Sequence, residues 1–308
     1  MTAAEKFNIS VVIPAKNEAA SIGALVASIG KVLPDAEVVV VNDGSTDDTG
    51  AAAAAAGARV VNHPVSRGNG AAIKSGARHA RGDVLVFMDA DGQHVPSEIP
   101  RLLAFLDQGY DMAVGTRSAS AHASSGRRLA NGVYNTLASW ITGTQILDLT
   151  SGFRAVNGKL FRSFLSLLPN GFSYPTTITM AMLRAGHSVG YVRTEVAPRA
   201  AGTQSHIRPL RDGGRFFLII FRVGTLYSPL KVFAPLSLFF FVTATLYYGY
   251  TAIAWGRFTN LGALLYMTSV LVFLIGLVSE QVTTLLYSSN ASEIEPADPK
   301  AGASGDRA

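Results

Sequence analysis

The stretch VLVFMDADGQH, residues 84–94, carries the strongest structural signal in this sequence. It begins as an apolar run typical of a buried strand and ends in two carboxylates, Asp89 and Asp91. Side chains alternate along a strand, so residues two apart point the same way, and both carboxylates are expected to meet one hard divalent cation, Mg²⁺ or Mn²⁺. Gln93 and His94 follow and could add ligands. Taken alone, the pattern also fits a solvated turn.

Apolar runs of strand length alternate with helical patterns through the first third of the chain. This order predicts an α/β fold with a mostly parallel sheet and helices on both faces. The expected strands are Ile9–Pro14, Glu37–Asn42, Arg59–Asn62, Asp83–Asp89 and Met112–Gly115. Four helices are expected, at Glu18–Val32, Ser45–Ala56, Gly68–Arg81 and Pro96–Leu106. The second begins with a capping pattern at Ser45 and continues through a run of alanines.

Polar clusters follow three of these expected strands. They are residues 16–18 (Lys-Asn-Glu), residues 42–44 (Asn-Asp-Gly) and residues 89–93. Ligands of such sheets bind at the carboxyl ends of the strands, so the three clusters predict one binding site at one edge. A single cluster could be turn chemistry, whereas three at the same edge favour a site.

The composition sets further limits. Cysteine is absent, which excludes a disulfide framework and any cysteine-ligated metal. The net charge is +5. Residues 1–10 lack the charged, apolar and small-residue order of a secretory signal peptide. A dinucleotide-binding enzyme is disfavoured, because no Gly-x-Gly-x-x-Gly follows the first expected strand.

Two uncharged apolar runs near the C-terminus, Val232–Trp255 and Leu261–Ser279, are each about long enough to span a bilayer. The alternative is a pair of buried core helices. Lys231 and several arginines precede the first run, while the connecting loop carries only Arg257. The positive-inside rule then places the N-terminal region and the C-terminal tail in the cytoplasm, and makes the protein a two-span membrane protein.

The segment 207–228 places Arg208, Arg211, Arg215 and Arg222 on one face of a potential helix. This pattern favours an amphipathic helix on anionic headgroups, although a plain basic lead-in to a span also fits. The expected organisation is a cytoplasmic catalytic domain at 1–206, a juxtamembrane segment at 207–230, a transmembrane hairpin at 231–287 and a disordered tail at 288–308.

Four motifs in this order resemble family 2 glycosyltransferases of the GT-A fold. They are SVVIPAKNE at 10–18, VNDGSTD at 41–47, MDADGQH at 88–94 and DLTSGFR at 148–154. With the two C-terminal spans, the chain resembles the polyprenyl-phosphate glycosyltransferases, the group that contains dolichol-phosphate mannose synthase. The resemblance extends from about residue 10 to residue 287.

The resemblance implies a role for each matching position. Asp89, Asp91 and Gln93 match the metal and diphosphate site, and Asp91 is also a candidate catalytic residue. Positions matching the nucleotide site of the donor are Pro14, Ala15, Asn17, Glu18, Asp43, Asp89 and Ala90. Positions matching the acceptor-phosphate site are Arg117, Arg127 or Arg128, Arg199 and Ser205. Arginine suits phosphate because its planar fork donates two hydrogen bonds.

Asp148 matches the usual candidate for the catalytic base. A phosphate monoester is already largely dianionic at neutral pH, because its second pKa is about 6, so the acceptor hardly needs a base. Asp148 is therefore expected to act as base, to orient the sugar or the acceptor, or to shape the turn from Asp148 to Arg154. The sequence departs from the family pattern at two places. His206 stands in place of a lysine, and Pro175-Thr176-Thr177 replaces a segment that contains a glutamate. The identity of the transferred sugar therefore stays open.

The predicted function is metal-dependent, inverting transfer of one sugar from a GDP- or UDP-linked donor to a polyprenyl phosphate. The predicted partners are these two substrates and membrane lipid, with no nucleic acid and with a possible homo-oligomer. A processive polysaccharide synthase is disfavoured, because neither tryptophan, Trp140 or Trp255, lies in a Gln-x-x-Arg-Trp motif. Another lipid acceptor, or a non-catalytic nucleotide-sugar-binding scaffold, stays open as an alternative.

Overall fold

The computed structural model describes residues 6–117, 125–171, 174–195, 221, 224–225, 227–257 and 259–292. The chain divides into two compact units, Met1–Tyr227 and Ser228–Ala308, and each is described by itself. The predicted juxtamembrane segment 207–230 and the predicted tail lie mostly outside the described residues, so these domain boundaries stay predictions.

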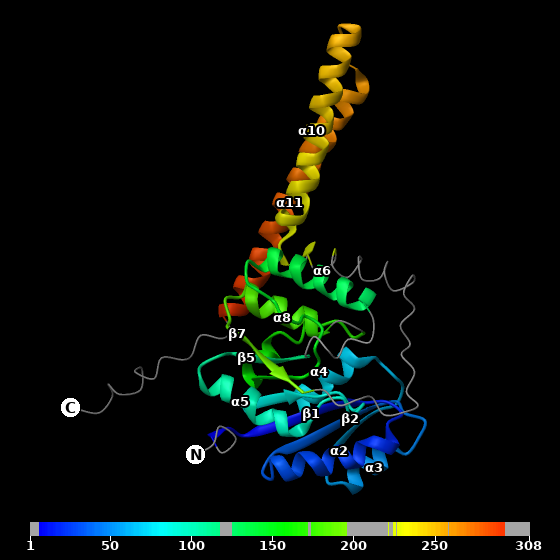
Figure 1. The fold of residues 1–308 in the computed structure, drawn as a ribbon, viewed down its shortest axis with the longest axis vertical. Coiled ribbons are helices and arrows are strands. Elements are labelled where there is room, and N and C mark those ends of the chain that lie inside the picture. Colours follow the sequence, from blue (N-terminus) through cyan, green and yellow to red (C-terminus); the bar gives the residue numbers. More distant parts are fainter. Residues whose placement is uncertain are drawn as a thin grey trace, which may run out of the picture. The chain divides into compact units, whose positions relative to one another are not determined.

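The first unit is built on a seven-stranded sheet with the order β3-β2-β1-β4-β6-β5-β7 (Figure 1). All neighbouring pairs are parallel except those of β6, which runs antiparallel to β4 and β5. The strands are β1 (Ile9–Ala15), β2 (Glu37–Asp43), β3 (Arg59–His63), β4 (Val84–Phe87), β5 (Met112–Arg117), β6 (Arg154–Asn157) and β7 (Val189–Thr194). The predicted mostly parallel α/β sheet is confirmed.

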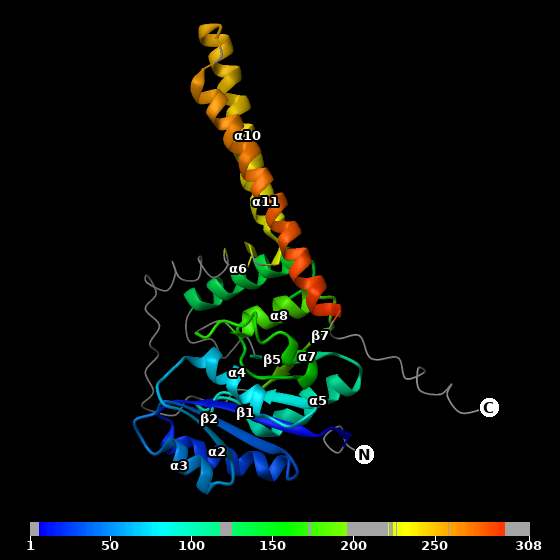
Figure 2. The ribbon, with the colours of Figure 1, turned by 180° about the vertical axis from the view of Figure 1, so that it is seen from behind.

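Helices cover both faces of this sheet (Figures 1 and 2). They are α2 (Ala19–Val32), α3 (Thr49–Ala55), α4 (Asn69–His79), the short 3₁₀ helix η1 (Pro96–Glu98), α5 (Ile99–Asp107), α6 (Ser125–Thr142), α7 (Gly158–Ser163) and α8 (Tyr174–Arg184). The expected helix start at Ser45 was wrong, since α3 begins at Thr49, where the Asp47 carboxylate accepts a hydrogen bond from the Thr49 N–H at 3.1 Å.

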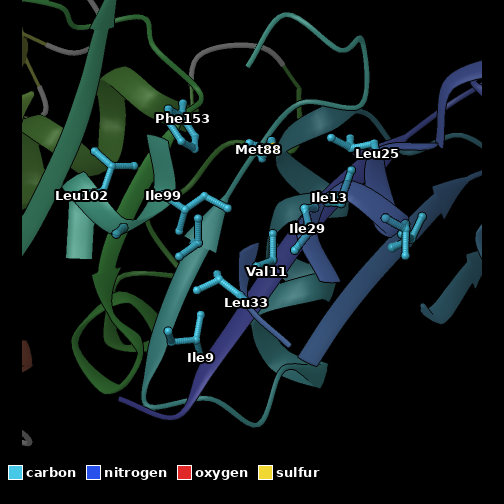
Figure 3. Close-up of a cluster of buried hydrophobic side chains, with 14 of the residues drawn as sticks. Ile9, Val11, Ile13, Leu25, Ile29, Leu33, Met88, Ile99, Leu102 and Phe153 are labelled. Atoms are coloured by element: carbon cyan, nitrogen blue, oxygen red, sulfur yellow. The ribbon is translucent and has the colours of Figure 1, made fainter. Parts of the chain in front are cut away.

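The main core lies between the sheet and helices α2 and α5. Alternate residues of β1, including Val11 and Ile13, belong to one buried cluster with Ile22 and Ile29 of α2 and Leu102 of α5, and all five are fully buried. Figure 3 shows part of this cluster. Residues between them in β1 and β2 face α4. A Cβ at Gly76 of α4 would come 2.2 Å from Cγ1 of Val12, so only glycine permits this close helix–sheet packing.

The second unit is a hairpin of α10 (Pro229–Trp255) and α11 (Asn260–Ser292). Pro229–Trp255 and Asn260–Leu285 are long and apolar enough to cross a membrane, with mean hydropathies of 1.6 and 2.4. Only 11% and 17% of the residues in their most apolar windows are buried, unlike core helices of a soluble protein. Apolar side chains therefore face outward over most of both helices, as expected of membrane spans.

Small and polar residues join the two helices of the hairpin. The hydroxyls of Ser237 and Ser269 each donate to the other residue's backbone carbonyl, at 2.9 and 3.0 Å. Gly276 lies against Phe233, where a Cβ would come within 2.6 Å. The carboxylate of Glu280 accepts the N–H of Leu230 at 3.2 Å, in the first turn of α10, where the helix dipole favours a negative charge. Such contacts are those that hold helices together in lipid.

Candidate active site

The loops after β1 and β2 interlock at the edge where the parallel strands end, here called the carboxyl edge. Asn17 adopts a left-handed backbone conformation, with φ of 56°, and its Oδ1 accepts the N–H of Thr46 at 2.8 Å. Its own N–H donates to the Ser45 hydroxyl at 3.0 Å, and the N–H of Glu18 donates to Thr49 Oγ1 at 2.8 Å. Asn17 therefore fixes both loops of the predicted nucleotide site relative to each other.

The third polar cluster joins the first through Ser21 of α2. Its hydroxyl lies 2.9 Å from Glu18 Oε2 and 3.2 Å from the carbonyl oxygen of Ala90. Pro14 and Ala15 pair with Val41 and Asn42 of β2 at the same edge. The structure thus brings together the residues predicted to bind the donor nucleotide, while their role stays a prediction.

Asp43 is the last residue of β2, and its carboxylate organises the loop after β3. Oδ1 accepts from His63 Nδ1 at 2.7 Å and from the Arg67 N–H at 2.8 Å. Oδ2 accepts from the Ser66 hydroxyl at 2.8 Å and from the Gly68 N–H at 2.9 Å. Although burial opposes it, this set of donors lowers the pKa of Asp43. The four hydrogen bonds from the protein occupy the acceptor positions of the carboxylate. Asp43 would therefore contribute to binding of the nucleotide sugar indirectly, by shaping the loop.

Replacing Asp43 should show this organising role as a pH-dependent loss of stability. At neutral pH, Asp43→Asn should lower the free energy of unfolding by about 3 kcal/mol, because buried donors lose a charged acceptor. The folded pKa lies below the unfolded value of about 3.9, so the stabilisation is present above that pH and is lost as the pH falls through the folded pKa. Denaturant unfolding from neutral to acidic pH checks this, with Asp35→Asn, an exposed position, as control.

The Asp89-Ala90-Asp91 segment is a turn and not the end of a strand. Strand β4 stops at Phe87, residues 90–91 form the turn, and Gly92 has a φ of 69°. Asp91 Oδ1 accepts the N–H of Gln93 at 3.1 Å. The expectation that strand alternation orients both carboxylates was therefore wrong. Both follow β4 at the carboxyl edge, but a turn determines their direction.

The surroundings of Asp89 fit a hard cation. A Cβ at Gly152 would come 2.8 Å from Asp89 Oδ2, so a glycine leaves the room for this carboxylate. The ring of His94 is buried against Phe153, and its Nε2 lies 3.8 Å from Asp89 Oδ2, which is too far for a hydrogen bond. In the described part of the chain, no three His, Cys, Asp or Glu side chains cluster as a complete metal site. Asp89 and Asp91 would thus share a cation with amide, water or phosphate oxygens, as Mg²⁺ prefers.

Asp148 sits in the turn that leads to β6. Its Oδ1 accepts three hydrogen bonds, from the Thr150 N–H at 2.9 Å, the Thr150 hydroxyl at 3.0 Å and the Ser151 N–H at 3.1 Å. All three bonds end on the same oxygen and lock the carboxylate in one orientation. Oδ2 takes no part in these three bonds, and a role for Asp148 toward a ligand stays a prediction.

Arg154 links the Asp89 and Asp148 regions from inside the fold. It begins β6 opposite Phe87 and Val114, and its side chain is fully buried. Its guanidinium donates to Ser151 O, to Pro175 O and Thr179 Oγ1 at 3.2 Å each, and lies over the ring of Tyr174. Burial lowers the pKa of Arg154, whereas the charges of Asp148 and Asp89 oppose that shift. Arg154 is thus a buried counter-charge whose guanidinium donates its hydrogen bonds to the protein itself.

Asn135 of α6 is a site residue that sequence reasoning missed. Its side-chain amide donates to the carbonyl oxygen of Leu147 at 2.7 Å and accepts the N–H of Leu149 at 3.2 Å. It therefore holds the backbone on both sides of Asp148. No sequence signal marks it, because an asparagine inside a helix usually faces solvent, and only the fold shows that α6 passes beside this turn.

Removing the Asn135 side chain, which holds the backbone on both sides of Asp148, should affect catalysis more than folding. Asn135→Ala is expected to reduce kcat by up to about a hundredfold, because a displaced Asp148 no longer orients a substrate. In an Asp148→Asn background the same change should cost far less, since both variants remove one function. Transferase kinetics on the four proteins measure this coupling, with Thr136→Ala as the exposed neighbouring control. If the losses of kcat in the two single variants simply added up in the double variant, Asn135 would not act through Asp148.

Only some of the residues predicted to bind the acceptor phosphate belong to the described part of the chain. Arg117 is the last residue of β5, at the carboxyl edge, and Arg127 and Arg128 belong to the first turn of α6. Arg199 and Ser205 lie outside the described residues. Their shared role in binding phosphate stays a prediction.

This combination of a mixed α/β sheet of GT-A type with carboxylates after its fourth strand defines a glycosyltransferase. The chain belongs to glycosyl transferase family 2, whose pattern matches residues 10–165. A second pattern, the GtrB C-terminal hairpin, matches residues 228–285 and so covers most of α10 and α11.

Named relatives transfer sugars. The chain is 30% identical to glycosyltransferase AglJ of Haloferax volcanii, over 77% of this chain and 78% of that protein. It is 35% identical to polyprenol monophosphomannose synthase of Mycolicibacterium smegmatis, over 62% of this chain and 78% of that one. It is also 35% identical to undecaprenyl-phosphate 4-deoxy-4-formamido-L-arabinose transferase of Edwardsiella ictaluri, over 54% of this chain, but it spans only 57% of that protein.

Solved structures of a related enzyme share the fold. Glucosyl-3-phosphoglycerate synthase from Mycobacterium tuberculosis, in complex with Mn²⁺, uridine diphosphate and glucosyl-3-phosphoglycerate, superposes with a TM-score of 0.57. The two sequences are 26% identical over 72% of this chain and 80% of that chain.

Proposed function

We propose that this glycosyltransferase moves one sugar from a nucleotide-diphosphate sugar to a membrane polyprenyl phosphate, with inversion at the anomeric carbon. The observation that carries the proposal is that one chain contains both features: Asp89 and Asp91 at the carboxyl edge of the sheet, and a helical hairpin apolar enough to cross a membrane. The names of two relatives, a polyprenol monophosphomannose synthase and an undecaprenyl-phosphate transferase, support this acceptor class.

The nucleotide sugar would bind at the carboxyl edge of the sheet. The interlocked loops of Asn17 and Glu18, with the loop that Asp43 organises, form the nucleotide side of the site. Asp89, Asp91 and Gln93 would hold Mg²⁺ or Mn²⁺, which supplies charge neutralisation to the diphosphate and to the leaving nucleotide. The metal-bound structures of the related synthase support a divalent cation.

The acceptor side needs cations and an orienting group. Arg117, Arg127 or Arg128, and Arg199, with Ser205, would bind the acceptor phosphate. Asp148 has one oxygen fixed by three hydrogen bonds, and its other oxygen would orient the incoming phosphate or the sugar. An anionic phosphate is already a competent nucleophile, so positioning and electrostatic stabilisation supply most of the catalysis. The catalytic unit would lie on the cytoplasmic side.

A transfer assay on membranes containing the full chain tests the proposal. A panel of GDP- and UDP-linked sugars is offered with a polyprenyl phosphate, with Mn²⁺ or with a chelator. One donor should yield a lipid-phosphate sugar, and the chelator or Asp91→Ala should abolish that product. Asp107→Ala is the control, because this carboxylate forms an exposed ion pair with Lys6.

Two results would count against the proposal. Labelling of a hydroxyl-bearing lipid in place of the polyprenyl phosphate would keep the transferase and replace its acceptor. Nucleotide binding by the folded protein without transfer from any donor would favour a non-catalytic scaffold.

A further inference from the structure

Residues 64–68 join β3 to α4 at the carboxyl edge and are here called the β3–α4 loop. The side chains of residues 64–67 are exposed, so the loop has no buried side chain of its own among them to anchor it. It is held instead by three hydrogen bonds to the Asp43 carboxylate. It also lies close over Gly44, where a Cβ would come 2.5 Å from the backbone nitrogen of Ser66. The orientation of the Asp43 carboxylate therefore determines where this loop lies.

The fourth hydrogen bond to Asp43 comes from His63, its partner in the register of β2 and β3. A carboxylate oxygen only accepts, so the Nδ1 of His63 carries a proton and donates it to Asp43 at 2.7 Å. The Nε2 of the same ring lies 2.8 Å from the Ser75 hydroxyl in α4. Both ring nitrogens are thus hydrogen-bonded and the ring is buried, which fixes its orientation from two sides.

These bonds form a closed circuit around the loop. The hydrogen-bond chain Ser75–His63–Asp43 leads from α4 to the end of β2. From Asp43 the N–H of Gly68 leads back to the start of α4, at Asn69, and the helix itself returns to Ser75. Because the protein uses both nitrogens of a buried ring, a direct contact between His63 and a substrate is disfavoured. Its effect on a ligand would pass through Asp43.

We propose that His63, supported by Ser75, is a positioning residue for the nucleotide part of the donor. It sets the orientation of the Asp43 carboxylate and so holds the β3–α4 loop in place on the nucleotide side of the site. This inference rests on the proposed function, in which a nucleotide-diphosphate sugar binds at the carboxyl edge. The chain acts on the nucleotide side, whereas Asp89 and Asp148 are the groups proposed near the reacting bonds. Loss of His63 should therefore raise KM for the donor and leave kcat nearly unchanged.

Nucleotide binding by the full chain in detergent tests this role without sugar transfer. UDP and GDP are each titrated in the presence of Mn²⁺, and calorimetry gives the Kd. His63→Leu removes the donor to Asp43 and should raise the Kd of the bound nucleotide about tenfold, whereas Ser75→Ala removes only the outer bond and should raise it about threefold. His63→Asn keeps a side-chain N–H that can donate to Asp43, so its Kd should be closer to that of Ser75→Ala than to that of His63→Leu.

Hydrogen exchange supplies a second readout, at the loop itself. Amide exchange in residues 64–71 should be faster in His63→Leu than in the parent protein, and slower in His63→Asn than in His63→Leu. Ser28→Ala is the matched control, because Ser28 belongs to α2, which packs on the other face of the sheet from α4. It should change neither the Kd nor the exchange of the loop.

Three results would overturn the proposal. Lower stability of the His63 and Ser75 variants with unchanged Kd and KM would make His63 an ordinary core histidine. A fall in kcat at constant KM would place its action on the reaction step. If the parent protein bound neither UDP nor GDP, the proposed donor class would fall and this proposal with it. Binding without transfer would contradict only the proposed reaction, because the Kd values of the variants still test His63. If His63→Leu does not fold, His63→Asn and Ser75→Ala give the same comparison.

Discussion

Asp89→Asn is expected to lower kcat/KM for sugar transfer by roughly a thousandfold, which corresponds to a loss of about 4 kcal/mol of transition-state stabilisation. The amide keeps the shape of the carboxylate in the space left by Gly152, but it removes the charge that would hold a divalent cation. Initial rates over a series of Mn²⁺ concentrations measure the effect, and added metal should restore only part of the activity.

Two further variants separate loss of charge from loss of geometry. Gly152→Ala keeps both carboxylates but adds a Cβ that would meet Asp89 Oδ2 at 2.8 Å, so it should weaken the response to metal without removing it. Asp107→Asn removes an exposed carboxylate elsewhere and should behave as the parent protein. Wild-type rates for Asp89→Asn at every metal concentration would refute a role for Asp89 in cation binding.

The sequence alone predicted the five strands β1 to β5 within about two residues at each end and the single edge where their loops meet. This part was predictable because apolar runs and polar loop clusters are local signals. The path of the chain after β5 was not predictable in the same way. Strand β6 has four residues and begins with Arg154, so nothing in its composition indicates a strand buried between β4 and β5.

The candidate site shows the same division. The motifs identified Asp89, Asp91 and Asp148, but the turn geometry of residues 89–91 contradicted the strand argument that first drew attention to them. Asn135 lies in α6 and Asp148 in a separate turn, and only tertiary packing reveals that Asn135 binds the backbone of the residues on either side of Asp148. Contacts of this kind depend on how the elements pack and not on local spacing.

Arg154→Met is expected to lower the free energy of unfolding by about 3–5 kcal/mol, the usual cost of removing one member of a buried charged network. Methionine fills part of the volume, but the carbonyl oxygens of Ser151 and Pro175 each lose a guanidinium donor, and Asp148 and Asp89 lose a nearby positive charge. Denaturant unfolding of the purified full chain in detergent measures the loss. Arg193→Met, at an exposed position in β7, should change stability by less than about 0.5 kcal/mol.

A double-variant cycle then tests whether the charge of Arg154 is the cause. Burial disfavours the Arg154 cation and the negative charges of Asp148 and Asp89 favour it, so each carboxylate is worth more when the arginine is present. Asp148→Asn should therefore destabilise the parent protein more than it destabilises Arg154→Met, with a coupling of about 1 kcal/mol. Equal effects in both backgrounds would mean that Arg154 stabilises the fold only through its volume and its hydrogen bonds to backbone carbonyls. A positive coupling would instead show that the carboxylate proposed to orient the substrate also helps to keep the buried arginine charged.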